Sequence, residues 1–323
     1  MCVEMQTFPV HQEHFTEIRD ELSKLFHVSA HLGFPFTLEE AANYFLPKTN
    51  LTPTQLRSLL SSQELIDLGF VLKDGYLLAG CEQTIASRSE RQRISAAKLA
   101  SAATFASLLT KLVPFIRTVA VTGSVAYGSA DKWDDIDLFI VTDRNRLWIS
   151  AFLMLIQVRL HKIFALRAPH LLPFCLSYVH DAEGFSKESR RNRANSLFAR
   201  ELLKAKPVAG FEEYRKILQE NSWVGQYYSA PYSEKLEMLG EAFDGSSRPR
   251  PSNSSGLRGF FLDWAEGIAY EFLSRYLRLR AYVTNLKFES EGRNLRTFEP
   301  MMSTVSCVYT SNFYRWLSAL WGT

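Results

Sequence analysis

Two neighbouring runs of sequence decide the fold of this chain: Thr118-Val-Ala-Val-Thr-Gly-Ser-Val-Ala-Tyr-Gly-Ser129 and Asp134-Asp-Ile-Asp-Leu-Phe-Ile-Val141. The first is an apolar strand that breaks at Gly123-Ser124, and the second begins an apolar strand with Asp135 and Asp137. Residues two apart on a strand point to the same face, so both carboxylates converge on one point. A hard divalent cation such as Mg²⁺ requires such a convergence of oxygen ligands.

The Gly123-Ser124 corner predicts a second kind of binding. Its backbone N–H groups and the Ser124 hydroxyl stand near the start of a predicted helix, where phosphate oxygens are readily bound. A phosphate site that faces a carboxylate pair indicates metal-assisted chemistry on a nucleoside triphosphate. The simpler alternative is an ordinary Gly-Ser turn beside a solvated strand edge.

Together the motifs resemble the signature of the DNA polymerase beta-like nucleotidyltransferase superfamily, over roughly residues 118–142. The match runs from Thr122-Gly-Ser124 through the spacer Ala126-Tyr-Gly-Ser129 to Asp135-Ile-Asp-Leu138. The resemblance implies an α+β fold with a mixed β-sheet and transfer of a nucleotidyl group to a hydroxyl with two Mg²⁺ (or Mn²⁺) ions. It implies Asp135 and Asp137 as metal ligands and catalytic residues. On the phosphate side it implies Gly123, Ser124, Gly128 and Ser129.

Members of this superfamily usually carry a third carboxylate on a later strand. The best later strand is predicted over 173–180, and its same-face residues Cys175 and Ser177 are not acids. Asp181, just past the end of the strand, is the first candidate for the third catalytic acid, and a surface turn residue is the alternative. Two further acids are stand-ins: Asp143 and Glu183.

The segment 186–206 is basic, with seven Lys and Arg against two Glu. We expect a helical stretch that begins at Arg190 and contains Asn195. Related proteins often use helices beyond the sheet to grip phosphates, so Arg190, Arg193 and Asn195 are candidate nucleotide contacts. Further on, Trp223 either stacks on a base or packs in the core.

The first part of the chain, 1–85, resembles a winged helix-turn-helix domain. Capping boxes at Thr37 and Thr52 predict two helices, and Asp74-Gly75 predicts a tight hairpin after them. Through residue 82 there are 11 Asp and Glu against 5 Lys and Arg, a formal charge of −6. Because phosphate contacts supply most non-specific affinity for DNA, this charge argues against DNA binding and favours a docking or scaffold role.

The segment 86–114 is predicted to be a connecting helix. Arg91 and Lys98 lie seven residues apart, hence on one helical face. That face either leans toward a triphosphate or forms a solvated basic stripe. The remaining boundaries are a nucleotidyltransferase core with its following helices over 115–243, a flexible Pro/Ser/Gly-rich linker over 244–256 and a C-terminal helical segment over 257–323.

Composition limits the class of protein. The 323 residues are 46% hydrophobic, with a net charge of only +3, so no polyanion partner is indicated. Four scattered cysteines and an N-terminus without an apolar signal core suit a cytoplasmic protein. The apolar stretch 147–166 is interrupted by polar residues, so we expect a buried core helix and no membrane partner.

Two functions follow from these observations. The first is a Mg²⁺-dependent nucleotidyltransferase that uses a nucleoside triphosphate, with ATP expected, and an acceptor hydroxyl on a protein, a small molecule or RNA. The second is a catalytically weak or inactive nucleotide-binding regulatory protein of the same fold, since no third carboxylate stands on the later strand. A winged-helix transcription regulator is a weaker third hypothesis. The oligomeric state is left open.

Overall fold

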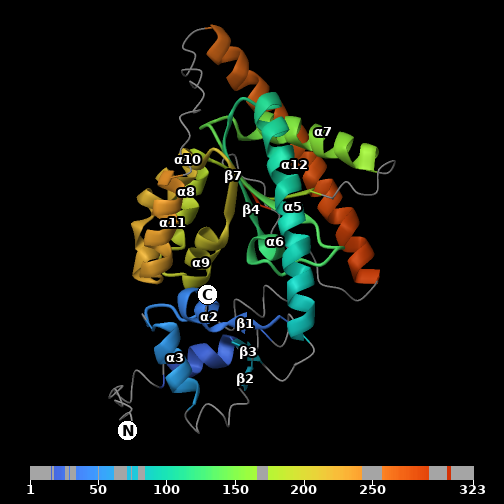
Figure 1. Cartoon of the computed structure of the whole chain (residues 1–323). Helices are drawn as coiled ribbons and strands as arrows, with labels where there is room; N and C mark the ends of the chain where they lie inside the picture. The colour runs from blue at the N-terminus through green and yellow to red at the C-terminus, as the bar shows by residue number, and fades with distance from the viewer. Residues whose placement is uncertain are drawn as a thin grey trace, which may run out of the picture. The chain divides into compact units, whose positions relative to one another are not determined.

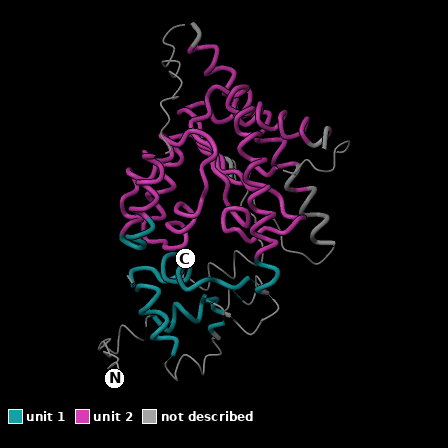
Figure 2. The backbone as a smooth tube through the Cα atoms, viewed as in Figure 1, with its two compact units in different colours: residues 1–88, 226–231 teal, residues 89–225, 232–323 magenta. Residues whose placement is uncertain are grey.

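The computed structural model describes residues 16, 18–25, 29, 34–49, 51–61, 71–73, 75–78, 84–165, 174–241, 257–290 and 304–306. The chain forms two compact units, residues 1–88 with 226–231 and residues 89–225 with 232–323 (Figure 2). The Gly-Ser corner and the Asp-x-Asp strand both belong to the second unit. The predicted linker 244–256 lies outside the described residues.

The first unit contains helices α2 (Leu38–Tyr44) and α3 (Pro53–Leu60) and a small antiparallel sheet. Both capping boxes form, with the Thr37 and Thr52 hydroxyls each accepting a hydrogen bond from a backbone N–H three residues on. The sheet has the order β1-β3-β2, with β1 (Phe36–Thr37), β2 (Val71–Lys73) and β3 (Tyr76–Leu78). The hairpin β2–β3 is the predicted one, and the assignment to the winged-helix class stays a prediction.

The second unit is built on a five-stranded mixed sheet of order β7-β4-β5-β6-β8. The strands are β4 (Ile116–Thr122), β5 (Ile136–Thr142), β6 (Phe174–Asp181), β7 (Lys206–Ala209) and β8 (Thr304–Ser306). Only the pair β5–β6 is parallel; the other neighbours are antiparallel. The α+β class and the mixed sheet expected from the sequence are therefore present.

Helices cover both faces of this sheet (Figure 1). They are α5 (Thr84–Leu112), the short α6 (Gly123–Tyr127), α7 (Leu147–Ala165), α8 (Ala182–Arg191), α9 (Ser196–Lys204), α10 (Phe211–Glu220), η1 (Ser222–Gln226), α11 (Ser229–Glu241) and α12 (Leu257–Ser290). The helices α5, α7 and α12 lie on one face, and α8 and α10 lie on the other (Figure 1).

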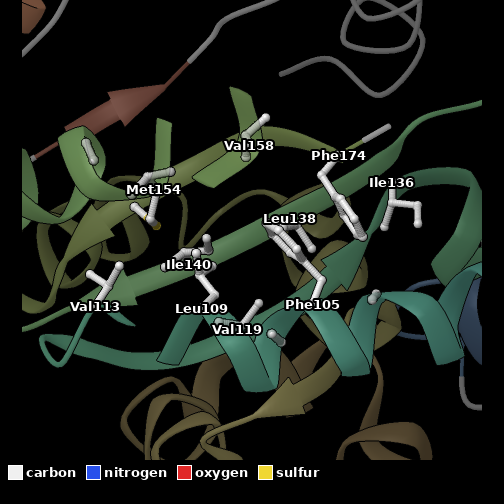
Figure 3. Packing of buried hydrophobic residues seen from close by; sticks show 14 of the residues in the cluster. Phe105, Leu109, Val113, Val119, Ile136, Leu138, Ile140, Met154, Val158 and Phe174 are labelled. Atoms are coloured by element: carbon white, nitrogen blue, oxygen red, sulfur yellow. The ribbon is translucent and has the colours of Figure 1, made fainter. Parts of the chain in front are cut away.

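The main hydrophobic core lies between the sheet and the first of these helix layers (Figure 3). Alternate strand residues point into it, such as Val119 of β4 and Leu138 of β5, because side chains alternate along a strand. They pack against Phe105 of α5 and Met154 of α7. The helix α7 thus packs one face into the core, as predicted, whereas Phe152, Ile156, Leu160 and Ile163 on its other side are exposed. No helix in the described part of the chain is long and apolar enough to cross a membrane.

The opposite face of β5 carries both an aromatic cluster and the site. Phe139 packs against Phe185 of α8 (ring centroids 5.4 Å apart) and Tyr214 of α10 (6.3 Å). Asp137 lies two residues before Phe139 and therefore points to this same face. The sheet thus separates the main core from the face that carries the acidic pair.

Three local predictions need correction. Arg190 does not begin a helix: α8 begins at Ala182 because the Asp181 carboxylate caps it, and Arg190 lies in its last turn. A new helix, α9, begins after Asn195. The C-terminal segment expected to be helical also supplies the strand β8, which pairs with β6 at the edge of the sheet.

Candidate active site

Three adjacent strands bring the predicted metal-binding residues together with a thiol. At the end of β4, Thr122 pairs with Asp137 of β5, so Gly123 lies directly beside that carboxylate. In the parallel pair β5–β6, Asp137 stands opposite Cys175. Asp135 precedes β5 on the same side. One carboxylate oxygen of each aspartate and the Cys175 Sγ all lie within 4.8 Å of one another.

Gly123 allows the close approach of these strands. Its φ is +64°, a left-handed conformation that residues with a side chain rarely adopt. A Cβ built at this position would lie 2.5 Å from Asp137 Oδ2, which is far inside van der Waals contact. The corner therefore requires glycine on two independent grounds, backbone conformation and space.

Ser177 orients Asp137 from the neighbouring strand. The β5–β6 register shifts after Leu138, and Ser177 is left without a strand partner in this bulge. Its hydroxyl donates a short hydrogen bond to Asp137 Oδ1. Oδ1 is thus occupied by a donor, while Oδ2 stays on the side of Gly123.

Burial and neighbouring carboxylates both disfavour the charged form of Asp137. Burial raises the pKa of Asp137 to about 6, although the hydrogen bond from Ser177 opposes the rise. The carboxylates of Asp135, Asp134 and Glu201 add to it. Asp135 itself is exposed. A cation bound between Asp135 and Asp137 would relieve both the burial cost and the repulsion.

The residues present fit a divalent metal ion. Two carboxylate oxygens and one sulfur atom lie within 4.8 Å of one another, close to the separation of ligands on one ion, and Gly123 has no side chain that would cover Asp137 Oδ2. Carboxylate oxygens suit Mg²⁺ and Mn²⁺, whereas thiolate sulfur suits softer ions. The donor set is therefore mixed.

The phosphate side of the site is the helix α6 and the turn after it. The Thr122 side chain makes no capping hydrogen bond at the start of α6. Gly128 ends the helix in the left-handed region, with φ +75°, as a C-terminal glycine commonly does. Ser129 donates its backbone N–H (2.9 Å) and its hydroxyl (3.3 Å) to the Ser124 carbonyl. In this structure Gly128 and Ser129 therefore close the helix, while Ser124 stands partly exposed in its first turn.

The helix α5 fixes the loop that leads into Asp135. Ser95 accepts the backbone N–H of Ala130 at 3.0 Å. Lys98, 1% exposed, donates to the carbonyl of Asp131 at 2.7 Å and makes a short bond to that of Asp134. Neither alternative expected for Lys98 is therefore correct, because its ammonium group lies under the loop and holds backbone. The sequence indicates a cation at this position of the helix, but its hydrogen-bond partners follow only from the fold.

The helix α9 reaches the site through α6. The Tyr127 hydroxyl donates to Glu201 Oε1 at 2.5 Å, and the Lys204 ammonium lies 5.5 Å from the centroid of the Tyr127 ring. This link was not predicted. It places one acid and one lysine of α9 beside the helix that begins at the Gly-Ser corner.

The structure does not bring Asp181 to the acidic pair. Asp181 pairs with Thr142, at the other end of the β5–β6 ladder, five residues along β5 from Asp137 and thus roughly 16 Å away. It is 2% exposed, and its carboxylate accepts the backbone N–H groups of Gly184 (2.7 Å) and Asn145 (3.1 Å). Asp181 is a buried helix cap, so neither the expected catalytic position nor a surface turn describes it.

The two stand-ins are also engaged elsewhere. Asp143 Oδ1 accepts a hydrogen bond from Arg117 Nε at 2.8 Å. Glu183 pairs with Arg144 (2.7 Å) and Lys187 (2.8 Å). Among the described residues, the position beside Asp137 on β6 is therefore held by Cys175.

The candidate nucleotide contacts beyond the sheet differ in their surroundings. Asn195 is the N-cap of α9, and its side-chain oxygen accepts the backbone N–H of Phe198 at 3.1 Å. Arg190 and Arg193 are exposed, and Arg190 donates to Ser186 one turn earlier. Trp223 is buried, stacked on Phe198 with ring centroids 6.3 Å apart, so its packing role is confirmed.

A sheet that presents an Asp-x-Asp pair beside a glycine corner is typical of nucleotide-transferring enzymes. Residues 104–222 match the family described as the nucleotidyltransferase domain. This match supports the resemblance of this part of the chain to the DNA polymerase beta-like nucleotidyltransferase superfamily. The matched range contains the corner, both aspartates and Cys175. No curated protein and no solved structure matches the chain.

Proposed function

We propose that the chain transfers a nucleoside monophosphate from a nucleoside triphosphate, with ATP expected, to a hydroxyl group. The observation that carries this proposal is the convergence of Asp135 and Asp137 beside the Gly123-Ser124 corner, within a nucleotidyltransferase domain. A divalent ion held by Asp135 and Asp137 would neutralise phosphate charge and align the acceptor oxygen for attack at the α-phosphorus.

The residues of the chain have distinct parts in this reaction. Asp137 is held rigidly, since Ser177 donates to Oδ1 and Gly123 keeps Oδ2 uncovered. Asp135 is the exposed member of the pair and faces the incoming substrate. The Ser124 hydroxyl and the first amides of α6 bind the outer phosphates. The loop before Asp135 keeps its geometry because Lys98 holds its carbonyls.

The acceptor hydroxyl belongs, in this proposal, to a protein side chain or a small molecule. A long nucleic acid requires many phosphate contacts, and the net charge of the chain is only +3. RNA ends are the remaining alternative.

Transfer from an α-³²P-labelled triphosphate in a cell lysate tests the proposal and also identifies the acceptor. Wild-type protein with Mg²⁺ or Mn²⁺ should label an acceptor, and Asp135→Asn or Asp137→Asn should abolish labelling. Asp143→Asn is the matched control, because Asp143 follows the same strand but lies outside the group and should retain labelling. Full labelling by both site variants would refute the metal assignment.

A regulatory protein that binds nucleotide without turnover is the second candidate. It is favoured by one observation: among the described residues, the acids considered for the third carboxylate all bond elsewhere. Titration calorimetry with Mg²⁺ and each of the four ribonucleoside triphosphates, followed by the labelling assay, distinguishes the two. Binding that depends on Asp137 without any label transfer would support the regulatory candidate.

A further inference from the structure

The position next to Asp137 on β6 carries sulfur where an oxygen ligand is expected. Cys175 is the strand partner of Asp137, and its side chain lies on the same face of the sheet. It is half-buried, and it forms no disulfide with another described residue. Its Sγ and the nearest carboxylate oxygens of Asp135 and Asp137 are within 4.8 Å of one another.

This spacing is close to that of three ligands around one ion. Metal–oxygen distances of about 2.1 Å and metal–sulfur distances of about 2.3 Å separate two ligand atoms by at most about 4.4 Å. Small side-chain rotations therefore suffice to bring all three atoms onto one ion. Ser177 bonds to Asp137 Oδ1, and the absence of a Cβ at Gly123 keeps Oδ2 accessible.

We infer that the Cys175 thiolate is the third protein ligand of the metal ion, so that the site binds thiophilic divalent ions of the Zn²⁺ and Cd²⁺ class more tightly than Mg²⁺. The inference rests on the metal site of the proposed function. Mg²⁺ takes oxygen ligands in an octahedron, and a thiolate is a poor member of that set. Sulfur ligands and the order of affinities along the divalent series both favour Zn²⁺.

Cd²⁺ titration of the full chain tests the inference directly, because a Cd²⁺–thiolate bond gives an ultraviolet charge-transfer band. Wild-type protein should develop this band with one equivalent of Cd²⁺. In Cys175→Ser the band should disappear, and the Cd²⁺ affinity measured by calorimetry should fall at least about tenfold. The Mg²⁺ affinity should stay within about twofold, because both aspartates remain.

Two further variants show whether Cd²⁺ is bound by Cys175 together with the aspartates or by Cys175 alone. Asp137→Asn should also lower the Cd²⁺ affinity about tenfold or more, since the ion would lose a ligand. Cys175→Asp should instead raise the Mg²⁺ affinity, because it supplies a third carboxylate. A band that survives in Cys175→Ser, or a Cd²⁺ affinity unchanged in Asp137→Asn, would overturn the inference.

A measurement on unmodified protein covers the case in which a variant fails to fold. Alkylation of Cys175 by iodoacetamide, followed by peptide mass spectrometry, should be slowed by Zn²⁺ but not by the same concentration of Mg²⁺. Equal protection by the two ions, or none by either, would contradict thiolate ligation. These readouts do not require turnover. If Cd²⁺ binds as expected but no label is transferred, Cys175 remains a metal ligand and the transferase proposal is rejected. If label is transferred but the Cd²⁺ band is absent, only the assignment of Cys175 as a ligand is rejected.

Discussion

Gly123 is the residue on which the active-site geometry most depends. In Gly123→Ala the new Cβ would meet Asp137 Oδ2 at 2.5 Å, and the φ of +64° would be strained. We expect label transfer to fall at least about a hundredfold, because a small misplacement of a reacting group has effects of that size. The unfolding free energy should fall by more than about 1 kcal/mol, the scale of a glycine with positive φ.

Gly75→Ala is the control for backbone strain alone. Gly75 also has positive φ, +83°, but a Cβ there meets nothing within 4 Å. This variant should lose some stability and keep both metal affinity and transfer. If Gly123→Ala behaved in the same way, the contact with Asp137 would be unimportant.

The carboxyl group of Asp137 should make the metal-free protein pH-sensitive. Its pKa is raised from 3.8 to about 6, so the folded state binds this proton more tightly than the unfolded state does. Its contribution to stability is therefore fully present below pH 3.8 and is lost as the pH rises through 6. The loss is on the order of 3 kcal/mol, at 1.36 kcal/mol for each pKa unit.

Asp137→Asn removes this titration. In the absence of metal, the variant should unfold at a higher temperature than wild type at pH 7.5, and the difference should shrink toward pH 5. Its transfer activity should be lost. Thermal unfolding followed by circular dichroism at both pH values is the measurement, and a variant less stable than wild type at pH 7.5 would contradict the expectation.

At the scale of elements, α5 supports the loop that leads into Asp135. Lys98→Met removes the ammonium that bonds to the carbonyls of Asp131 and Asp134. We expect a loss of about 2 kcal/mol in unfolding free energy, the scale of hydrogen bonds to a charged group. The apparent Mg²⁺ affinity should also fall, because the loop sets the position of Asp135.

Lys111→Met serves as the matched control on the same helix, because Lys111 is exposed near its C-terminus. Calorimetric Mg²⁺ titration and thermal unfolding should show lower affinity and lower stability for Lys98→Met but wild-type values for Lys111→Met. Equal behaviour of Lys98→Met and Lys111→Met would mean that the loop holds its shape without the buried ammonium.

The sequence predicts those elements whose signals are local. The strands around Gly123 and Asp137, the long helix before them and both capping boxes are readable because each pattern is contained within a few residues. The edge strand β7 was not predicted, since its four residues include Pro207 and no alternation. The bulge at Ser177 and the bonds of Lys98 depend on residues more than 30 positions away. No local pattern could reveal them.

The predicted catalytic position of Asp181 was wrong for the same reason, because the register between strands is not a local property of the sequence. Parity along β6 suggested that its side chain would face the site, but parity gives no position along the strand. Only the register with β5 shows that Cys175 lies beside Asp137 and that Asp181 lies beside Thr142. A carboxylate just before a helix is also the usual chemistry of an N-cap, which was the stronger local signal.

At the scale of the whole molecule, the two units should respond separately to mutation. Arg88, 3% exposed, belongs to the first unit and pairs with Glu40 at 2.7 Å while lying over the ring of Phe34 at 4.5 Å. Arg88→Met removes the ion-pair partner of Glu40, whose other carboxylate oxygen still accepts the backbone N–H of Thr37. Hydrogen exchange measured by mass spectrometry should accelerate in 34–49, while β4 and β5 keep wild-type protection and the protein keeps its Mg²⁺ affinity. Faster exchange in β5 would show that the units are coupled.

The six residues 226–231 belong to the first unit although the nucleotidyltransferase domain precedes them in the chain. Lys48 donates its backbone N–H to the Tyr227 carbonyl at 2.8 Å, and its ammonium lies 4.8 Å from the centroid of the Tyr227 ring. During synthesis, the ribosome must therefore release the chain through at least Tyr227 before the amino-terminal unit can complete its contacts. A nascent chain therefore cannot complete the folding of its amino-terminal unit until the whole nucleotidyltransferase domain has been synthesised.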